Sequence, residues 1–343
     1  MAGIARSKKR VARVTIVDVA EEVGVSKTTI SRYINGKYEY MSDELRERIA
    51  EVIERMGYRP NNLARSLKSQ QSRMLGVIVA DLSTRFAPLL LKGISDCSER
   101  YGYRTLIAST DADYKKEREY IMSMIDQRVD GIILNTAGYN ADYVRQVHED
   151  TGTPFVLADR MQRGLEFDTV RSDDRAAITE ALRYLHDAGY ESVGFFVQSL
   201  RRSSTRIHRS KIMREVYPEI FGKEAQICSL KDAVADDEVV RKFLERNAGH
   251  RTAILTVNGV VTMRMIKVLQ QMGLSIPQEC GICSFDDWDW MSLIDGGLTA
   301  ISQQTYRIGR ECVKRMMRRL HRNKNAPAKL IELPCELVVR HST

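Results

Sequence analysis

The sequence predicts two kinds of structure in one chain: a small all-α domain of three helices, followed by a larger α/β core of two doubly wound lobes. Residues 15–57 repeat apolar side chains at helical spacing in three short segments, with glycines at their ends. From residue 74 onward, apolar runs typical of buried strands alternate with helical segments, and the alternation occurs in two successive runs. A chain of 343 residues is long enough to bury a core in each part.

Positive charge is concentrated at the N-terminal end of the chain. Of the net charge of +8, residues 1–73 hold +6, from 15 Lys and Arg against 9 Asp and Glu. Attraction to the phosphates of a nucleic acid requires such a concentration, whereas a charge that only keeps a protein soluble does not. Residues 1–14 hold no acidic side chain, and we expect them to form a basic arm.

The first two predicted helices are joined by a tight turn. Thr15 and Asp18 have nearly the spacing and chemistry of a capping box, which predicts a helix that begins after Thr15. Gly24 predicts a left-handed end for that helix, and Ser26 is a preferred N-cap for the next one. The outer face of the second helix then carries Lys27, Thr28, Ser31 and Arg32. Such residues near the N-terminal end are typical of a helix-turn-helix recognition helix, which reads base edges in the major groove.

A third amphipathic helix is predicted from Ser42 to Gly57 and covers the open side of the first pair. Pro60 ends the helical pattern, because proline disfavours helical angles in the residue before it. The helix-turn-helix domain is therefore predicted to span residues 15–60. Its core is thin, and we expect it to be only marginally stable alone.

Residues 61–72 are predicted to form a hinge helix and a linker. The segment from Asn61 to Leu67 is long enough for two helical turns, but a helix this short is marginal in isolation. It would expose Ala64 and Leu67, and apolar side chains can wedge between base steps in the minor groove. The alternative is an ordinary linker that buries Leu67 against a neighbouring element.

Residues 73–343 are predicted to form the two-lobed core. Its expected strands lie within residues 74–82, 103–109, 130–135, 153–159, 192–198, 252–257 and 280–285. Lobes of this type bind ligands at the carboxyl ends of their strands, and two such lobes place the ligand in the cleft between them.

Several other functions lack support in the sequence. No GxGxxG or GxxxxGK[ST] motif follows a strand, so no nucleotide cofactor is predicted. No nucleophile elbow and no HExxH motif is present, so we do not expect an enzyme. Among the six cysteines, only Cys280 and Cys283 form a CxxC pair. Three positions apart on a strand, their side chains point to opposite faces, so we expect reduced thiols in the core and no metal site.

Membrane association and export are not expected either. No apolar run approaches the roughly 20 residues that span a bilayer. The basic N-terminus is followed by a helical pattern rather than by the apolar segment of a signal peptide.

Over nearly its whole length, the chain resembles the LacI/GalR family of bacterial transcriptional regulators. The resemblance is carried by TIVDVAEEVGVSKTTISRYING and GYRPNNLARSL near the N-terminus, and by RVDGIIL, GLSIP, FDDWDW and LTAISQQTYRIG in the core. It implies a homodimer, two periplasmic-binding-protein-like lobes, an effector in the cleft, and a cytoplasmic, nucleoid-associated protein. It also implies that the hinge folds on operator DNA and inserts Leu67 into the minor groove of a near-palindrome. No heptad tail follows, which argues against the tetrameric variant of the family.

The resemblance also implies which residues form the two sites. Operator DNA would be contacted by Thr15, Ser26, Lys27, Thr28, Ser31, Arg32 and Asn35, and in the hinge by Asn61, Ala64 and Leu67. The effector would be contacted by Asp81, by the Ser83–Phe86 turn with Arg85 and Phe86, and by Asp159, Arg160, Arg206, Arg209, Asn258, Asp286 and Gln303. Trp288 is expected to stack on a sugar ring. The register of residues 203–210 leaves open whether His208 or Arg209 takes the family's usual Arg position.

Two departures from the family pattern bear on the ligand. The frequent Asn-Pro before Phe is Thr84-Arg85 here, and the family's Asn-Asp pair is Asn258-Gly259. One acid that accepts sugar hydroxyls is lost, and Arg85 is added to the other arginines. Paired arginines favour carboxylate or phosphate, so we expect an anionic sugar derivative such as a sugar acid. The chain also resembles the regulators of 2-keto-3-deoxygluconate metabolism. Salt bridges between lobes or between protomers are the alternative role of these arginines.

Taken together, the sequence predicts a repressor of carbohydrate catabolism genes that binds double-stranded operator DNA and a small sugar-derived effector. Effector binding would change the angle between the lobes and, through the hinge, the affinity for the operator. The alternative is a soluble sugar-binding or sugar-modifying protein with an incidentally basic N-terminus. Such a protein would not show salt-dependent DNA binding.

Overall fold

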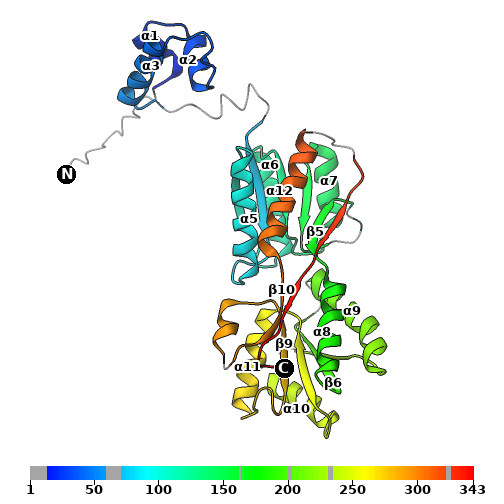
Figure 1. Cartoon of the computed structure of the whole chain (residues 1–343). Helices are drawn as coiled ribbons and strands as arrows, with labels where there is room; N and C mark the ends of the chain where they lie inside the picture. The colour runs from blue at the N-terminus through cyan, green and yellow to red at the C-terminus, as the bar shows by residue number, and fades with distance from the viewer. Residues whose placement is uncertain are drawn as a thin grey trace, which may run out of the picture. The chain divides into compact units, whose positions relative to one another are not determined.

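The computed structural model describes residues 14–58, 71–161, 164, 166–199, 203–230, 235–294, 296–321 and 326–343. The chain divides into two compact units, Met1–Ser72 and Arg73–Thr343 (Figure 1). The predicted basic arm, apart from Val14, lies outside the described residues, and so does the predicted hinge with Asn61, Ala64 and Leu67. The finer predicted division at residues 14, 60 and 72 stays a prediction.

The N-terminal unit holds three helices, α1 (Ile16–Val23), α2 (Lys27–Ile34) and α3 (Asp43–Met56). The predicted capping box is confirmed: the amide of Thr15 donates to the Asp18 carboxylate at 2.7 Å, and the amide of Asp18 donates to Thr15 Oγ1. Gly24 ends α1 in the left-handed region, at φ 78°. The Ser26 hydroxyl caps α2 by accepting from the amide of Thr29 at 3.1 Å. The turn between α1 and α2 is therefore fixed by its own local chemistry.

A single small apolar cluster holds these three helices together. Its buried members are Val19, Ala20, Val23, Ile30, Ile49, Val52 and Tyr58. Ile30 of α2 and Ile49 of α3 are both 0% exposed, so they sit at the centre of the cluster. So few buried side chains leave little reserve against the loss of any one of them.

The first lobe of the core is a parallel sheet covered on both faces. Within the described ranges the sheet has the strand order β11-β5-β4-β3-β1-β2. Its strands are β1 (Met74–Val79), β2 (Arg104–Ser109), β3 (Gly131–Leu134), β4 (Phe155–Ala158), β5 (Asp168–Ser172) and β11 (Leu330–Leu333). Helices α5 (Phe86–Arg100) and α12 (Thr305–His321) bury one face, and α6 (Tyr114–Asp126) and α7 (Ala141–Thr151) bury the other (Figure 1).

The second lobe repeats this plan with the order β12-β10-β9-β8-β6-β7, in which β12 pairs antiparallel to β10. Its strands are β6 (Ser192–Val197), β7 (Gln226–Ser229), β8 (Thr252–Thr256), β9 (Gly281–Phe285), β10 (Thr299–Ser302) and β12 (Glu336–Val338). Its helices are α8 (Asp174–Asp187), α9 (Ser204–Phe221), α10 (Asp236–Arg246), α11 (Gly259–Gln271) and the 3₁₀ helix η2 (Asp289–Leu293).

The predicted fold class is confirmed, but the expectation of one lobe after the other needs a correction. The chain crosses from the first lobe to the second after β5, returns after β10 to form α12 and β11, and crosses again to form β12. Gly93 of α5 and Gly309 of α12 let these two helix backbones meet, because a Cβ at either position would overlap the backbone of the partner helix. The first lobe is thus completed by residues from near the C-terminal end.

Cys280 and Cys283 are both buried in the core of the second lobe, and burial raises the pKa of each thiol to about 12. Over the described part of the chain, no group of three or more His, Cys, Asp and Glu side chains is arranged to hold a metal ion. Within the same residues, none of the helices combines the length and apolar character of a membrane span.

Candidate functional site

Helix α2, the predicted recognition helix, presents the expected polar face to solvent. Lys27, Thr28 and Arg32 are exposed and Ser31 is half-buried. The side chains of Lys27, Thr28 and Arg32 form no hydrogen bond or ion pair with the described residues, so their donors are available to a ligand. Spaced at i, i+1, i+4 and i+5, the four side chains share one side of the helix.

The other predicted DNA contacts already serve the helices themselves. Thr15 and Ser26 are the N-caps of α1 and α2, and the Asn35 amide donates to the Ser31 carbonyl at 2.7 Å. Thr15, Ser26 and Asn35 are all exposed. Because helix N-termini attract phosphate, the two caps lie where a phosphate contact is favourable.

A cavity of ≈190 Å³ lies between the two lobes of the core. Its polar walls come from residues that follow strand ends: Asp81 after β1, Asn135 after β3, Asp159 and Arg160 after β4, Gln198 after β6, Asn258 after β8, Asp286 after β9 and Gln303 after β10. The carboxyl ends of both sheets therefore face each other across the cavity, as predicted for lobes of this type. Phe86, Arg206, Arg209 and Trp288 also line it.

Some lining residues were not predicted from the sequence. They are Asn135, Gln198, Ser203, Thr205, Val257 and Val260. Asn135 and Gln198 each stand immediately after a buried strand, or one residue beyond it, as the predicted residues do. A polar residue at the end of a predicted strand was therefore a usable signal for these two.

Arg209 of α9 is the centre of a buried polar network behind the cavity. Only 3% of it is exposed, and its guanidinium donates to Asp174 at 3.1 Å, to the Val257 carbonyl at 2.9 Å and to Gln303 at 3.3 Å. Gln303 in turn donates to Asp286. Burial lowers the pKa of Arg209, but the carboxylates of Asp174, Asp159 and Asp286 outweigh it, so its pKa is raised.

Of the two residues that the register of residues 203–210 left open, Arg209 lines the cavity and His208 does not. The Arg209 guanidinium also lies 3.4 Å from the centroid of the Phe285 ring. Burial beside Arg171 lowers the pKa of His208 to about 4, which keeps that imidazole neutral at pH 7.

Arg160 and Arg206 differ from Arg209 because neither forms an ion pair with an acidic side chain among the described residues, although the charge of Asp81 acts on both. Arg160 donates to the Thr136 carbonyl at 3.1 Å, and Arg206 donates to the Ser199 carbonyl at 3.0 Å. Burial lowers the pKa of Arg160. Burial and the neighbouring charge of Arg160 lower the pKa of Arg206 to about 10. Arginine side chains keep their positive charge in proteins, and both groups line the cavity.

Arg85 is not brought to the cavity, which corrects the expectation that it adds positive charge there. It precedes α5 in the first lobe, and its guanidinium pairs with Asp289 of η2 in the second lobe at 2.6 Å. The two side chains are 43% and 75% exposed, so the pair lies at the surface. Arg85 therefore takes the alternative role of a salt bridge between lobes.

The Asn258-Gly259 departure has a local cause in the position of Trp288. A Cβ on residue 259 would overlap the Trp288 indole, so glycine makes room for that ring. The amide of Gly259 donates to Asp286 at 3.0 Å, and the Asn258 side chain caps α11. The acid that the family often has here is thus replaced by space for an aromatic wall.

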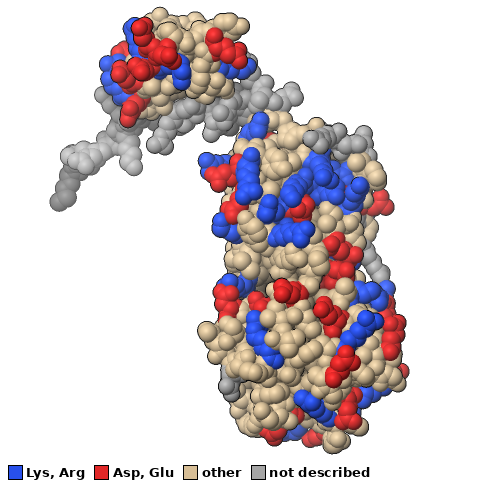
Figure 2. All heavy atoms as spheres, viewed as in Figure 1, with Lys and Arg blue, Asp and Glu red and all other residues tan. Residues whose placement is uncertain are grey.

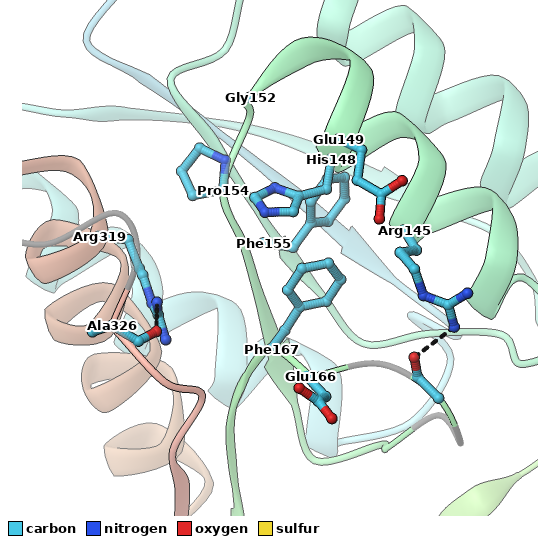
Figure 3. Close-up of a pocket in the computed structure, with 11 residues that line it drawn as sticks. Arg145, His148, Glu149, Gly152, Pro154, Phe155, Glu166, Phe167, Arg319 and Ala326 are labelled. Atoms are coloured by element: carbon cyan, nitrogen blue, oxygen red, sulfur yellow. Dashed lines mark hydrogen bonds between the residues drawn. The ribbon is translucent and has the colours of Figure 1, made fainter.

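A second and larger cavity, of ≈480 Å³, lies in the first lobe (Figure 3). It is lined by Phe155 and Phe167, whose rings stack at 5.6 Å, and by His148. Its two arginines are engaged: Arg145 donates to the Gly164 carbonyl at 2.6 Å, and Arg319 donates to Asp168 at 2.9 and 3.0 Å. This cavity lies at the amino ends of β4 and β5 and holds none of the predicted effector residues.

Comparison with known proteins gives consistent matches. Residues 15–61 match the family model described as "Bacterial regulatory proteins, lacI family", and residues 182–343 match "Periplasmic binding protein-like domain". The chain is 34% identical to the HTH-type transcriptional regulator KdgR of Bacillus subtilis (strain 168), over 98% of this chain and 99% of that protein. It is 32% identical to the HTH-type transcriptional regulator PtxS of Pseudomonas aeruginosa, over 96% of each.

Solved structures share the fold. The lac repressor dimer bound to operator and the anti-inducer ONPF matches with a TM-score of 0.82 and 20% identity, over 96% of this chain and 99% of that chain. A putative ribose operon repressor from Burkholderia thailandensis matches with a TM-score of 0.69 and 26% identity, over 78% of this chain and 99% of that chain.

Proposed function

Because the chain belongs to the lacI family of bacterial regulatory proteins, we propose that it represses carbohydrate catabolism genes under the control of an anionic sugar derivative. Members of this family are DNA-binding transcriptional regulators with an effector-binding domain, and they are not enzymes. The lac repressor, whose fold this chain shares, is a dimer in its complex with operator and anti-inducer. By analogy, the protein acts as a cytoplasmic homodimer on double-stranded operator DNA.

The proposed ligand class rests on Arg160 and Arg206, which line the cavity without an ion pair among the described residues. Both guanidinium groups line the cavity, and among the described residues both are bonded only to main-chain carbonyls. A carboxylate placed between them would form bidentate, charge-assisted hydrogen bonds and relieve the repulsion between two buried cations. The resemblance to regulators of 2-keto-3-deoxygluconate metabolism points to the same class of ligand.

The other residues that line the cavity suit the hydroxyl groups and the carbon skeleton of a sugar acid. Asp81, Asp159, Asn135 and Asn258 offer oxygen acceptors or amide groups for hydroxyls, and Trp288 offers an aromatic face. The cavity of ≈190 Å³ is smaller than the roughly 300–1,000 Å³ of usual small-molecule pockets, which favours an effector of one sugar unit. The predicted effector residues other than Arg85 are proposed to contact it.

Calorimetry on the full-length protein tests this ligand class. We expect 2-keto-3-deoxygluconate or a uronate to bind more tightly than neutral hexoses and sugar phosphates. Replacing Arg206 with glutamine should weaken sugar-acid binding by about 10- to 150-fold, because a hydrogen bond to a charged group contributes about 1.5–3 kcal/mol. The matched control is Arg85→Gln, which removes a charge outside the cavity and should change affinity by less than about five-fold, as expected for an exposed ion pair. Tight binding of only a neutral sugar would refute the proposal.

For the operator, we propose that Lys27, Thr28, Ser31 and Arg32 contact base edges, since their helix presents them together. Thr15, Ser26 and Asn35 are proposed to contact phosphates, and Asn61, Ala64 and Leu67 to contact the minor groove. In this proposal, residues 1–14 are the basic arm and residues 15–60 the helix-turn-helix domain. Residues 61–72 are the hinge helix and linker, and residues 73–343 the effector-binding core. The arginine of the recognition helix offers the sharpest test.

Replacing Arg32 with alanine is expected to cost about 1–3 kcal/mol on the operator, because it removes a base contact. Gel-shift titrations would compare an operator selected from random DNA with a random duplex. Arg48→Ala, an exposed arginine on α3, serves as the control. Equal losses on operator and random DNA would mean that Arg32 contacts only the phosphate backbone.

A further inference from the structure

The cavity of ≈480 Å³ in the first lobe has the size of a small-molecule site and is separate from the effector cleft. Among the described residues, the two cavities share no lining residue. The walls of the larger one come from α7, the start of β4, the residues just before β5, and the end of α12. Its volume falls within the roughly 300–1,000 Å³ of usual ligand pockets. We call it the α7 cavity.

One wall of the α7 cavity is aromatic. The rings of Phe155 and Phe167 stack at 5.6 Å, and His148 meets Phe167 edge-on at 5.1 Å. Figure 3 shows these three rings between Arg145 on one side and Arg319 on the other. Phe155 is buried, whereas Phe167 is half-buried, so part of the Phe167 ring stays open to the cavity. The face of such a ring carries partial negative charge and attracts cations.

The positive charges of the α7 cavity are already paired. Arg145 forms an ion pair with Asp142 at 3.0 Å and donates to the Gly164 carbonyl at 2.6 Å. Arg319 is bound by two of its nitrogens to Asp168, at 2.9 and 3.0 Å, and it donates to two main-chain carbonyls as well. An anion that entered the cavity would have to compete with these partners, so the cavity does not favour one.

The acceptors of the α7 cavity are not engaged in this way. The carboxylates of Glu149 and Glu166 form no hydrogen bond or ion pair with a described residue. The Thr153 carbonyl, 2.8 Å from His148 Nδ1, can only accept, so Nδ1 carries the proton and Nε2 of the neutral ring is an acceptor. These groups favour a ligand that donates hydrogen bonds and carries positive charge.

The negative charge of the cavity is a local feature of the first lobe. Figure 2 shows Lys and Arg gathered over the part of this lobe where α12 lies in Figure 1, so the lobe does not have a generally acidic surface that only keeps it soluble. At physiological salt, exposed charges more than about 8–10 Å apart are largely screened. The carboxylates at the cavity itself therefore decide which charge it favours.

We propose that the α7 cavity binds a small organic cation, an amine or ammonium compound whose apolar body packs against Phe167. Glu149 and Glu166 hold its charged head through charge-assisted hydrogen bonds, and the aromatic wall adds cation–π attraction. The charge preference is the opposite of that in the effector cleft, where Arg160 and Arg206 line the cavity. Neither the proposed effector nor DNA is needed for this binding.

The ligand would contact α7, β4 and the end of α12 at the same time, and these elements are far apart in the sequence. A compound that binds only the folded protein shifts the folding equilibrium toward the folded state. Binding in the α7 cavity should therefore raise the Tm of the core as the ligand concentration rises.

The test uses full-length protein and three probes with the same phenylethyl body: 2-phenylethylamine, 2-phenylethanol and 3-phenylpropionate. Affinities are measured at neutral pH by ligand-observed NMR titration, and the Tm is measured with each probe. We expect the amine to bind about five-fold or more tightly than the alcohol, and the carboxylate to bind most weakly. Equal affinity for all three probes would overturn the ligand class. No saturable binding of the amine would overturn the site.

The test variant is Glu149→Gln with Glu166→Gln, which removes both charges and keeps side chains of similar size. It should weaken binding of the amine by about 3- to 20-fold, because an exposed ion pair contributes up to about five-fold, and it should leave binding of the alcohol unchanged. The matched control is Glu99→Gln with Glu119→Gln, two exposed carboxylates of α5 and α6 in the same lobe. We expect this control to bind all three probes as the wild type does.

A third variant, Phe167→Leu, keeps an apolar side chain but removes the ring. It should weaken binding of the amine by about 2- to 5-fold through the loss of cation–π attraction. An amine affinity that is the same in the wild type and in the variant without Glu149 and Glu166 would place the binding elsewhere and overturn the inference.

Discussion

Replacing Arg209 with methionine is expected to lower the free energy of unfolding of the core by about 3–5 kcal/mol. The guanidinium has almost no contact with solvent, and Asp174, Asp159 and Asp286 all lie close enough to influence its pKa. Methionine fills much of the same space but leaves three carboxylates without their shared cation. A buried charge that loses its partner costs far more than an exposed one, because water cannot replace the lost interaction.

Urea unfolding followed by tryptophan fluorescence measures this change, since Trp288 and Trp290 both lie in the core. The matched control is Arg241→Met on α10, which removes an arginine from an exposed pair with Asp237 at 3.3 Å. We expect that control to cost less than about 1 kcal/mol. A similarly small loss of unfolding free energy for Arg209→Met would show that the three carboxylates are not stabilised by the Arg209 charge.

The second large effect is expected in the N-terminal unit. Replacing Ile30 with alanine should abolish operator binding, because the substitution unfolds the three-helix domain that contacts the operator. Ile30 is 0% exposed, and removing such a side chain costs about 2–5 kcal/mol. A domain of this size rarely holds more than about 3–5 kcal/mol in total, so most or all of its stability would be lost.

Three measurements separate unfolding of this domain from other causes. Circular dichroism should show a loss of helix, gel shift should show no specific complex, and calorimetry should show unchanged effector binding by the core. Ile30→Val is the graded control: it should cost about 0.5–1.5 kcal/mol and keep most of the binding. A folded Ile30→Ala protein with wild-type operator affinity would refute the view that this cluster is marginal.

The three N-terminal helices could be predicted from sequence because their limits depend on neighbouring residues. The Thr15 and Asp18 box, the left-handed Gly24 and the Ser26 cap each act within a few positions of the chain. Signals of this range are fully present in the sequence.

The cleft was predictable for a related reason. In parallel sheets the carboxyl ends of the strands gather at one edge, so a polar residue after each buried strand identifies the site. Asp81, Asp159 and Asp286 all follow strands that their apolar residues reveal. Asn135 and Gln198 satisfy the same criterion and could have been added by applying it to every strand.

What the sequence did not predict depends on long-range pairing. β7 and β11 are short strands with partly exposed side chains, so their apolar pattern is weak. The position of β7 depends on its pairing with β6, and that of β11 on its pairing with β5. Nothing local to α12 says that it packs on α5 rather than in the second lobe. The side chain of Arg85 likewise has its direction set by Asp289, which is distant in sequence.

The return of α12 and β11 to the first lobe has a consequence for the chain while it is being made. The apolar faces of β1 and α5 emerge from the ribosome early, but the side chains of α12 that cover them come only after the second lobe's strands β6 to β10. At roughly 5–20 residues per second, this delay is on the order of ten seconds. The second lobe is also incomplete until β12, its last strand in chain order, has been made. A chain that stops short of residue 305 therefore contains no finished lobe, and a nascent chain must keep its first apolar surface from aggregating until α12 has been made.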